Sequence, residues 1–129
     1  MTDWWLQSGG WPGWGQLFFA LAIGHALADY PLQSDFMARA KNRHFAHAFA
    51  DLPQRTLWAY VLTAHALIHA GCVWLITGRA GFALAEFALH WLIDWAKTER
   101  KIGFQTDQWL HLGCKAGYVA LLAWMTHGG

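Results

Sequence analysis

Four apolar stretches separated by short polar connections limit what this chain can fold into. They run over residues 14–30, 56–77, 81–96 and 108–126. A helix that crosses a bilayer needs roughly 17–25 predominantly apolar residues, so the first and third stretches are at the short end. Hydrophobic residues make up 56% of the chain and charged residues 13%, whereas an ordinary soluble domain has about 45–50% and about 25%. We therefore predict an all-α bundle of four transmembrane helices, forming a single integral-membrane domain over residues 1–129.

The basic residues predict how the four helices are oriented. Lys and Arg gather in the connection between the first two stretches and in the connection between the last two, whereas the middle connection has Arg79. Because cytoplasmic loops carry an excess of Lys and Arg, the two basic connections are expected in the cytoplasm, and both termini outside. The expected location is a bacterial inner (cytoplasmic) membrane, crossed several times, with the lipid bilayer as partner. A net charge of +1 gives no reason to expect a nucleic-acid partner.

Tryptophans mark both of the expected membrane interfaces. In this topology the outer interface holds Trp4, Trp5, Trp11, Trp14, Trp74 and Trp124, and the inner interface holds Trp58, Trp95 and Trp109. Tryptophan belts of this kind are typical of proteins that span a membrane. The alternative, a soluble four-helix bundle, is disfavoured because each of its helices should show a charged face.

The connection between the first two stretches predicts a short interfacial helix. Pro31 pushes Tyr30 out of the helical region and so ends or kinks the first helix. Ser34 is suited to cap a following helix, with Arg39 and Lys41 directed toward lipid headgroups.

A pair of glycines predicts close helix packing in the fourth stretch. Gly113 and Gly117 are four residues apart and form a small-xxx-small pair. Such a pair lets two helix backbones approach closely. It could therefore support a homo-oligomer.

Each apolar stretch also contains a histidine that is four residues from a second ionisable residue. In the first three stretches both residues lie inside the stretch, and in the fourth the aspartate directly precedes it. Residues at this spacing lie on one face of a helix, about 5–6 Å apart at Cβ, so each pair can converge on one point. In the two helices that run inward the histidine comes first, and in the last helix the aspartate comes first. The aspartates would thus form a layer near the cytoplasm, with histidines roughly 6 Å deeper at 1.5 Å per residue. The pairs are His25–Asp29, His65–His69, His90–Asp94 and Asp107–His111.

This constellation predicts a metal site. Ionisable groups inside a bilayer are costly and usually face the bundle interior, which makes them functional candidates. Imidazole and carboxylate ligate zinc, iron or manganese, and zinc is favoured here. Each aspartate could instead orient a ligating histidine, or the pairs could only bond neighbouring helices. The deep pair, His65 and His69, could form a separate site. The expected ligands are His25, His65, His69, His90, Asp94 and His111, and the candidate catalytic residues are Asp29, Asp94 and Asp107.

Further polar side chains are candidate contacts to a substrate or to its phosphate. The lysines among them could equally extend their charged ends to the interface. Glu86 lies four residues before His90 and leaves packing or a proton path open. The candidates are Lys41, Lys97, Lys115, Gln33 and Gln108.

These motifs resemble those of domain-of-unknown-function family 3307, a family of small bacterial and phage membrane proteins. The resemblance rests on HALADYPLQSDFMARAK, HALIHA, HWLIDWAK and DQWLH, in this order, and runs from about Phe18 to about Leu122. It departs at Tyr30, where Phe would be expected. The resemblance implies a multi-span membrane protein without an established activity. It highlights His25, Asp29, Gln33, Lys41, His65, His69, His90, Asp94, Lys97, Asp107, Gln108 and His111.

Four functions fit these residues. The first is a metal-dependent membrane hydrolase of a lipid or phosphate ester, similar in motif style to inner-membrane metal-dependent hydrolases. The second is a small metal or proton transporter, which needs a polar path from face to face, whereas a site closed on the outer side favours the hydrolase. The third is a non-catalytic phage membrane factor that associates through its glycines. The fourth is a redox protein whose histidines bind haem or a di-iron centre.

Overall fold

The computed structural model describes residues 13–53 and 55–128, in which helices are joined by turns and short irregular segments. This part contains no β-strand, so the all-α prediction is confirmed for it. Trp4, Trp5 and Trp11, which were assigned to the outer interface, lie outside the described residues. The helices are α2 (Gly13–Asp29), α3 (Asp35–Ala40), the 3-10 helix η1 (Arg43–Phe49), α4 (Leu57–Thr77), α5 (Ala80–Thr98) and α6 (Phe104–His127).

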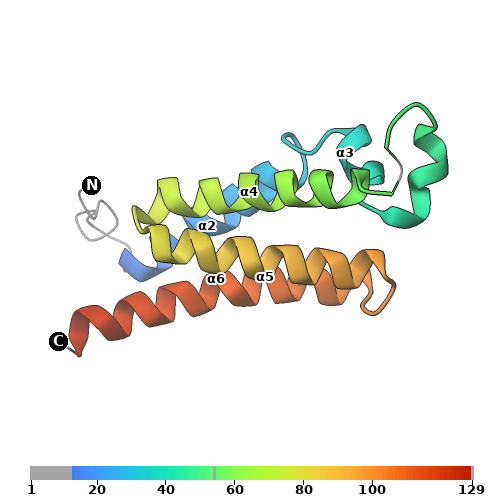
Figure 1. The fold of residues 1–129 in the computed structure, drawn as a ribbon. Helices are drawn as coiled ribbons and strands as arrows, with labels where there is room; N and C mark the ends of the chain where they lie inside the picture. Colours follow the sequence, from blue (N-terminus) through green and yellow to red (C-terminus); the bar gives the residue numbers. More distant parts are fainter. Residues whose placement is uncertain (1–12, 54, 129) are drawn as a thin grey trace.

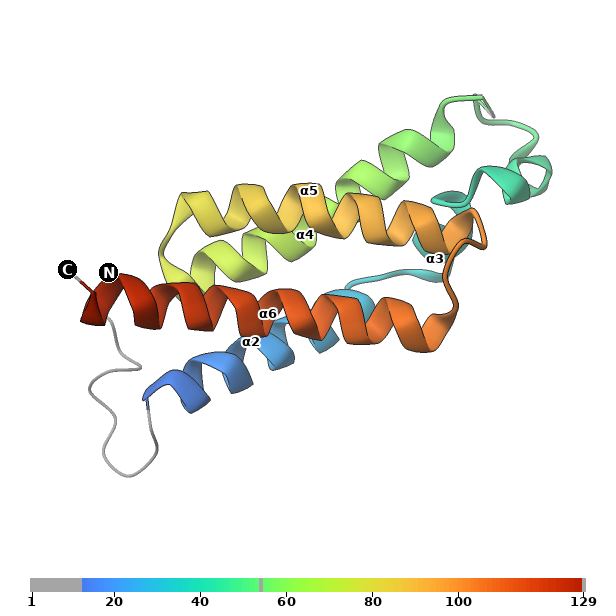
Figure 2. The ribbon, with the colours of Figure 1, turned by 90° about the horizontal axis from the view of Figure 1, so that it is seen from below.

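The four long helices coincide with the four apolar stretches and pack side by side (Figures 1 and 2). α4 packs against α2 and α5, and α6 also packs against α2 and α5, so the order around the bundle is α2, α4, α5, α6. α3, η1 and the α5–α6 connection lie together at one end, which we call the α3 end (Figure 1). The last turn of α6 and the α4–α5 connection lie at the opposite end, which we call the C-terminal end.

Local sequence explains where several helices begin and end. α2 ends at Asp29, just before Pro31, as the proline predicted. The side chain of Ser34 accepts a hydrogen bond from the Met37 backbone N–H at 3.1 Å, which confirms the predicted N-cap of α3. Gly78 closes α4 with a left-handed φ of 70°, a conformation that glycine adopts without steric cost.

The middle of the bundle is polar inside and apolar outside. The side chains of Glu86, His65 and Asp107 are completely buried, whereas Leu75 and Trp109 are 77% and 71% exposed. In water-soluble proteins ionisable side chains are mostly exposed and are rarely buried completely. The buried ionisable residues come from every long helix, and the side chains at the bundle surface are largely apolar.

An apolar cluster closes the polar interior at the C-terminal end. Its residues come from the beginning of α2 and α5 and from the later turns of α4 and α6, which meet at this end of the bundle. The polar interior is therefore sealed on this side by close-packed side chains. The cluster consists of Leu17, Leu21, Val73, Phe82, Tyr118 and Leu122.

Among the described helices, α4 is long and apolar enough to cross a membrane by length and composition. The core helix of a soluble protein can have the same properties, so the four-span arrangement stays a prediction. α2 is shorter, at 17 residues, and α5 and α6 carry ionisable side chains that lower their hydropathy. Gly113 and Gly117 lie on the exposed face of α6, and a Cβ at either position would meet nothing within 4 Å among the described residues. The homo-oligomer through these glycines also stays a prediction.

Candidate metal centre

Five histidines from the four long helices gather in the interior of the bundle. Each side chain is at most 6% exposed. The ring centroids of His69 and His90 are 3.6 Å apart, and those of His90 and His111 are 4.1 Å apart. The deep pair of α4 therefore belongs to the same cluster as the other histidines and does not form a separate one. The five are His25 on α2, His65 and His69 on α4, His90 on α5 and His111 on α6.

The predicted pairs on single helices come together in the structure. The closest nitrogen–oxygen distance is 3.3 Å for His25 and Asp29, and 3.7 Å between the Nε2 of His90 and the Oδ1 of Asp94. For the pair on α6, the Oδ1 of Asp107 lies 3.3 Å from the Nε2 of the histidine four residues on. The spacing of four thus places each carboxylate beside its histidine, as helix geometry requires.

The aspartates also join histidines of different helices. The Oδ1 of Asp29 lies 3.0 Å from the Nε2 of His69 and 3.3 Å from the Nε2 of His65. The Oδ1 of Asp94 lies 3.2 Å from the Nε2 of His111, and its Oδ2 lies 3.4 Å from the Nε2 of His65. One connected network therefore includes side chains from all four long helices.

Two groups of these side chains have donor atoms close enough to hold a metal ion. Within each group the candidate donor atoms all lie within 4.8 Å of one another. Zinc binds histidine nitrogen and carboxylate oxygen at about 2.0–2.2 Å in tetrahedral geometry, so two ligand atoms of one ion are about 3.4 Å apart and these donors would have to move only slightly closer to bind one. His90 belongs to both groups. The groups are Asp29, His65, His69 and His90, and His90, Asp94 and His111.

Several buried imidazole nitrogens support this fit. Both ring nitrogens of His65 and of His90, and the Nδ1 of His25, have no hydrogen-bond partner among the described residues. A carboxylate oxygen of Glu86 lies 3.4 Å from the Nδ1 of His90, but not in hydrogen-bonding geometry. Unpartnered polar atoms are costly to bury, and ligation of a metal ion would satisfy them. The donor set fits zinc, iron or manganese and does not select one of them.

Two lysines bind the aspartates from the α3 end. Lys41 follows α3, and its Nζ donates to the Oδ2 of Asp94 at 2.6 Å, with both side chains buried. The Nζ of Lys97, whose side chain is 30% exposed, donates to the Oδ2 of Asp107 at 3.1 Å. The other oxygen of each aspartate, Oδ1, faces His111.

The connection that carries Lys41 is fastened to the end of α5. Arg43, in η1, donates a hydrogen bond from Nη2 to the Oε2 of Glu99 at 2.7 Å. Hydrogen bonding to this guanidinium lowers the pKa of the Glu99 carboxyl below its usual value. The link holds η1, and with it the preceding lysine, against the bundle.

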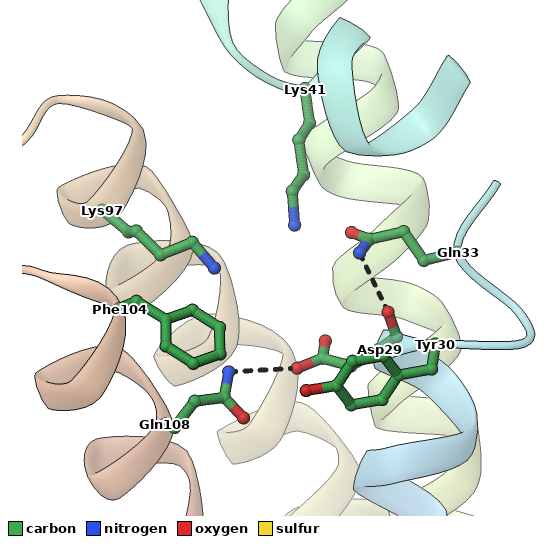
Figure 3. A pocket seen from close by; sticks show the side chains of 7 residues that line it. All are labelled: Asp29, Tyr30, Gln33, Lys41, Lys97, Phe104 and Gln108. Carbon is green, nitrogen blue, oxygen red and sulfur yellow. Dashed lines mark hydrogen bonds between the residues drawn. The ribbon is translucent and has the colours of Figure 1, made fainter. Parts of the chain in front are cut away.

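A pocket of about 70 Å³ opens between these lysines and the aspartates at the α3 end (Figure 3). Gln33 donates to the backbone oxygen of Asp29 at 2.9 Å. Gln108 donates to the Oδ2 of Asp29 at 3.3 Å and to the Oδ2 of Asp107 at 3.0 Å. Four of the five predicted substrate contacts therefore line this pocket. Its lining residues are Asp29, Tyr30, Gln33, Lys41, Lys97, Phe104 and Gln108.

The fifth predicted contact, Lys115, lies on the other side of the histidines. It is 1% exposed and donates a hydrogen bond to Glu86. Glu86 precedes His90 by one turn of α5, whereas Asp94 follows it by one turn. Tyr118, which the sequence did not single out, donates to the Oε2 of Glu86 at 2.9 Å. The sequence offered one signal for Tyr118: it follows Lys115 by three residues, and this spacing places both side chains on one face of α6.

The fold and its interior define a class of protein: a helical bundle with a buried His/Asp cluster that could hold a metal ion. The model of the family described as "Protein of unknown function (DUF3307)" matches residues 17–127. The chain belongs to this family, as its ordered motifs indicated. No curated protein and no solved structure matches the chain.

The buried pair of Lys41 and Asp94 makes a testable prediction about stability. In EDTA, Lys41→Met should lower the free energy of unfolding by about 3–5 kcal/mol, because it leaves a buried carboxylate without its cation. Adding Asp94→Asn should recover much of that loss. Equilibrium unfolding in detergent, followed by far-ultraviolet circular dichroism, measures both effects.

The matched control is Lys101→Met, because Lys101 is exposed and lies over the ring of Trp95, outside the pocket. This change should alter the free energy of unfolding by about 0.5 kcal/mol or less. A Lys41→Met variant as stable as the control would mean that the buried pair does not stabilise the fold.

Proposed function

We propose that this protein is a metal-dependent hydrolase of a lipid or phosphate ester, embedded in the bacterial inner membrane. The observation that carries the proposal is the pair of buried donor groups sharing His90, each with its donor atoms within 4.8 Å, beside a pocket that opens at the α3 end. Zinc is the expected ion, with iron or manganese as alternatives.

The distribution of polar residues supports a place in the membrane. Ionisable side chains inside a bilayer are expected to face the bundle interior and to pair with one another, as the carboxylates, lysines and histidines do here. At about 1.5 Å per residue, the 21 residues of α4 extend over roughly 31 Å, close to the roughly 30 Å of a hydrocarbon core. Lysines and arginines concentrate at the α3 end, which favours a cytoplasmic position for that end.

The closed end of the interior favours a hydrolase over a transporter. A transported ion or proton needs polar groups or water from one face to the other. Here the apolar cluster that includes Leu17, Phe82 and Leu122 lies beyond Glu86 at the C-terminal end. A substrate that enters the pocket at the α3 end therefore reaches a closed site.

The side chains at the pocket have distinct roles in the proposed reaction. A divalent metal held by these donor groups would supply a Lewis acid and would lower the pKa of a nearby water. With the ion held by His90, Asp94 and His111, Asp29 would stay outside the ligand set, and because it lines the pocket it is the carboxylate placed to take a proton from a water there. Asp107 holds Lys97 and Gln108 in position at the rim of the pocket. The interior excludes bulk water, which strengthens each of these electrostatic contacts.

The membrane topology is tested by cysteine labelling in intact cells. In a background with Cys72 and Cys114 changed to alanine, Gly128→Cys should react with a membrane-impermeant maleimide added outside. Lys101→Cys should react only after the inner membrane is permeabilised, because the basic connection lies in the cytoplasm. Labelling of both positions from outside, or release of the protein from membranes by carbonate, would contradict the four-span proposal.

Metal binding is tested by the metal content of detergent-purified protein, measured by mass spectrometry. Wild-type protein should hold zinc, iron or manganese in stoichiometric amount. His90→Ala should lower the affinity at least about tenfold, because this residue belongs to both donor groups. His127→Ala is the matched control, since this histidine is exposed at the end of α6. Absence of metal from wild-type protein after reconstitution would rule out a metal-dependent hydrolase.

Hydrolysis is tested with metal-loaded protein and two phosphate esters, p-nitrophenyl phosphate in solution and phosphatidic acid in mixed micelles. Release of p-nitrophenol or of inorganic phosphate should fall at least about a hundredfold in Asp29→Asn, which keeps the shape but loses the base. His127→Ala should retain the wild-type rate. Protein that binds metal but hydrolyses neither ester would contradict phosphate-ester hydrolysis while leaving the metal site intact.

A further inference from the structure

The buried charges at this site change sign when a divalent ion binds. The interior holds four carboxylates, those of Asp29, Glu86, Asp94 and Asp107, and three lysine ammonium groups, those of Lys41, Lys97 and Lys115. With every imidazole neutral, as a metal ligand must be, these carboxylates and ammonium groups sum to −1, and one divalent ion brings the sum to +1. A net positive charge in a low-dielectric interior favours binding of an anion nearby.

The two lysines at the pocket have donors to offer such an anion. An ammonium group has three N–H donors. Among the described residues, Lys41 and Lys97 each donate one hydrogen bond, to one carboxylate oxygen. Each ammonium group therefore has further N–H donors for an anion. Both Nζ atoms extend into the same pocket from opposite walls, with the side-chain amide of Gln108 below them (Figure 3).

These lysines can bind an anion without leaving the aspartates. Each takes the Oδ2 atom of its aspartate, whereas the Oδ1 atom faces His111 on the side of the candidate metal ligands. A metal held by His90, Asp94 and His111 would use the Oδ1 of Asp94, which leaves the Oδ2 of that aspartate to Lys41. The two sites are adjacent but do not compete for atoms.

Building on the proposed metal site, we propose that this pocket binds a phosphate group between Lys41 and Lys97, and that bound metal and bound phosphate strengthen one another's affinity. A volume of about 70 Å³ suits a small polyatomic anion, since about 10–15 Å³ is enough for one water. A lipid chain would have to remain outside the pocket. The phosphate can belong to a lipid headgroup or to a soluble molecule.

Lys115 is excluded from this role by its position. It is paired with Glu86 on the far side of the histidines and does not line the pocket. Its charge contributes to the net balance, but its ammonium group cannot contact a phosphate held at the α3 end. Of the three lysines predicted to contact a phosphate, the two that line the pocket, Lys41 and Lys97, therefore remain candidates.

The proposal is tested by calorimetric titration of detergent-purified, metal-free protein with Co²⁺, with and without inorganic phosphate. Phosphate should tighten Co²⁺ binding at least about fivefold, within the usual range of coupling between two sites. Titration with phosphate at saturating Co²⁺ should show the same factor, because coupling between binding sites is reciprocal. Blank titrations of Co²⁺ into phosphate correct for complexes in solution.

Variants then identify the residues that carry the coupling. Lys97→Met should keep Co²⁺ binding in the absence of phosphate and lose the strengthening by phosphate. Lys101→Met changes a lysine of the nearby α5–α6 connection, outside the pocket, and should keep both. Lys41→Met should behave as Lys97→Met does. If Lys41→Met does not fold, the result for Lys97→Met decides the question, because the side chain of Lys97 is partly exposed.

The outcomes separate this inference from the proposed function. If wild-type protein does not bind Co²⁺, both the metal site and the linked phosphate site are wrong. If Co²⁺ binds but neither inorganic phosphate nor phosphatidic acid tightens its binding, or the effect persists in Lys97→Met, the phosphate site alone is overturned. Nanodiscs of phosphatidylcholine with and without phosphatidic acid identify the source. A gain in Co²⁺ affinity that needs phosphatidic acid and Lys97 assigns a lipid headgroup, and a gain with inorganic phosphate alone assigns a soluble anion.

Discussion

The cost of burying charge governs the arrangement of this bundle. Asp94 is 2% exposed, and its two oxygens are surrounded by Lys41 from the α3 connection, His65 from α4 and His111 from α6. An isolated buried carboxylate would be strongly destabilising, whereas a paired and hydrogen-bonded one is tolerated. These contacts therefore fix the rotation of each long helix about its axis and its position along the bundle relative to its neighbours. Movement of any of them would leave a charge without its partner.

The same pairing divides the interior into regions with different chemistry. Beyond Glu86 the side chains become apolar and closely packed, so the interior ends there. Toward the α3 end a small pocket opens, and lysine, glutamine and aromatic side chains line it together with Asp29. Histidines with unpartnered nitrogens lie between these regions. A ligand that enters from the pocket meets ammonium groups first, then carboxylates, and then imidazoles.

The sequence predicted the helices and the paired residues within each helix, but not how the pairs meet. Spacing along one chain determines that His90 and Asp94 share a face, and Ser34 and Pro31 determine local helix ends. The contact of Lys41 with Asp94 joins residues 53 positions apart, and it depends on which helices are neighbours. The position of Lys115 away from the pocket depends on helix depth in the same way. Tyr118 was missed because a tyrosine among apolar residues gives no distinct signal.

The pattern of hydrogen bonds argues against a purely structural role for the histidines. Links between helices are already made by the lysine–carboxylate pairs, namely Lys41 with Asp94, Lys97 with Asp107 and Lys115 with Glu86. If the imidazoles served the same purpose, their nitrogens should lie in good hydrogen-bonding geometry, because unsatisfied buried donors and acceptors are costly. The Nε2 of His65 and both nitrogens of His90 instead lie near carboxylate oxygens without forming such bonds, and the Nδ1 of His65 has no hydrogen-bond partner among the described residues. Apolar side chains would fill these positions without the cost of burying polar groups, so a polar cluster here supports the proposed metal site.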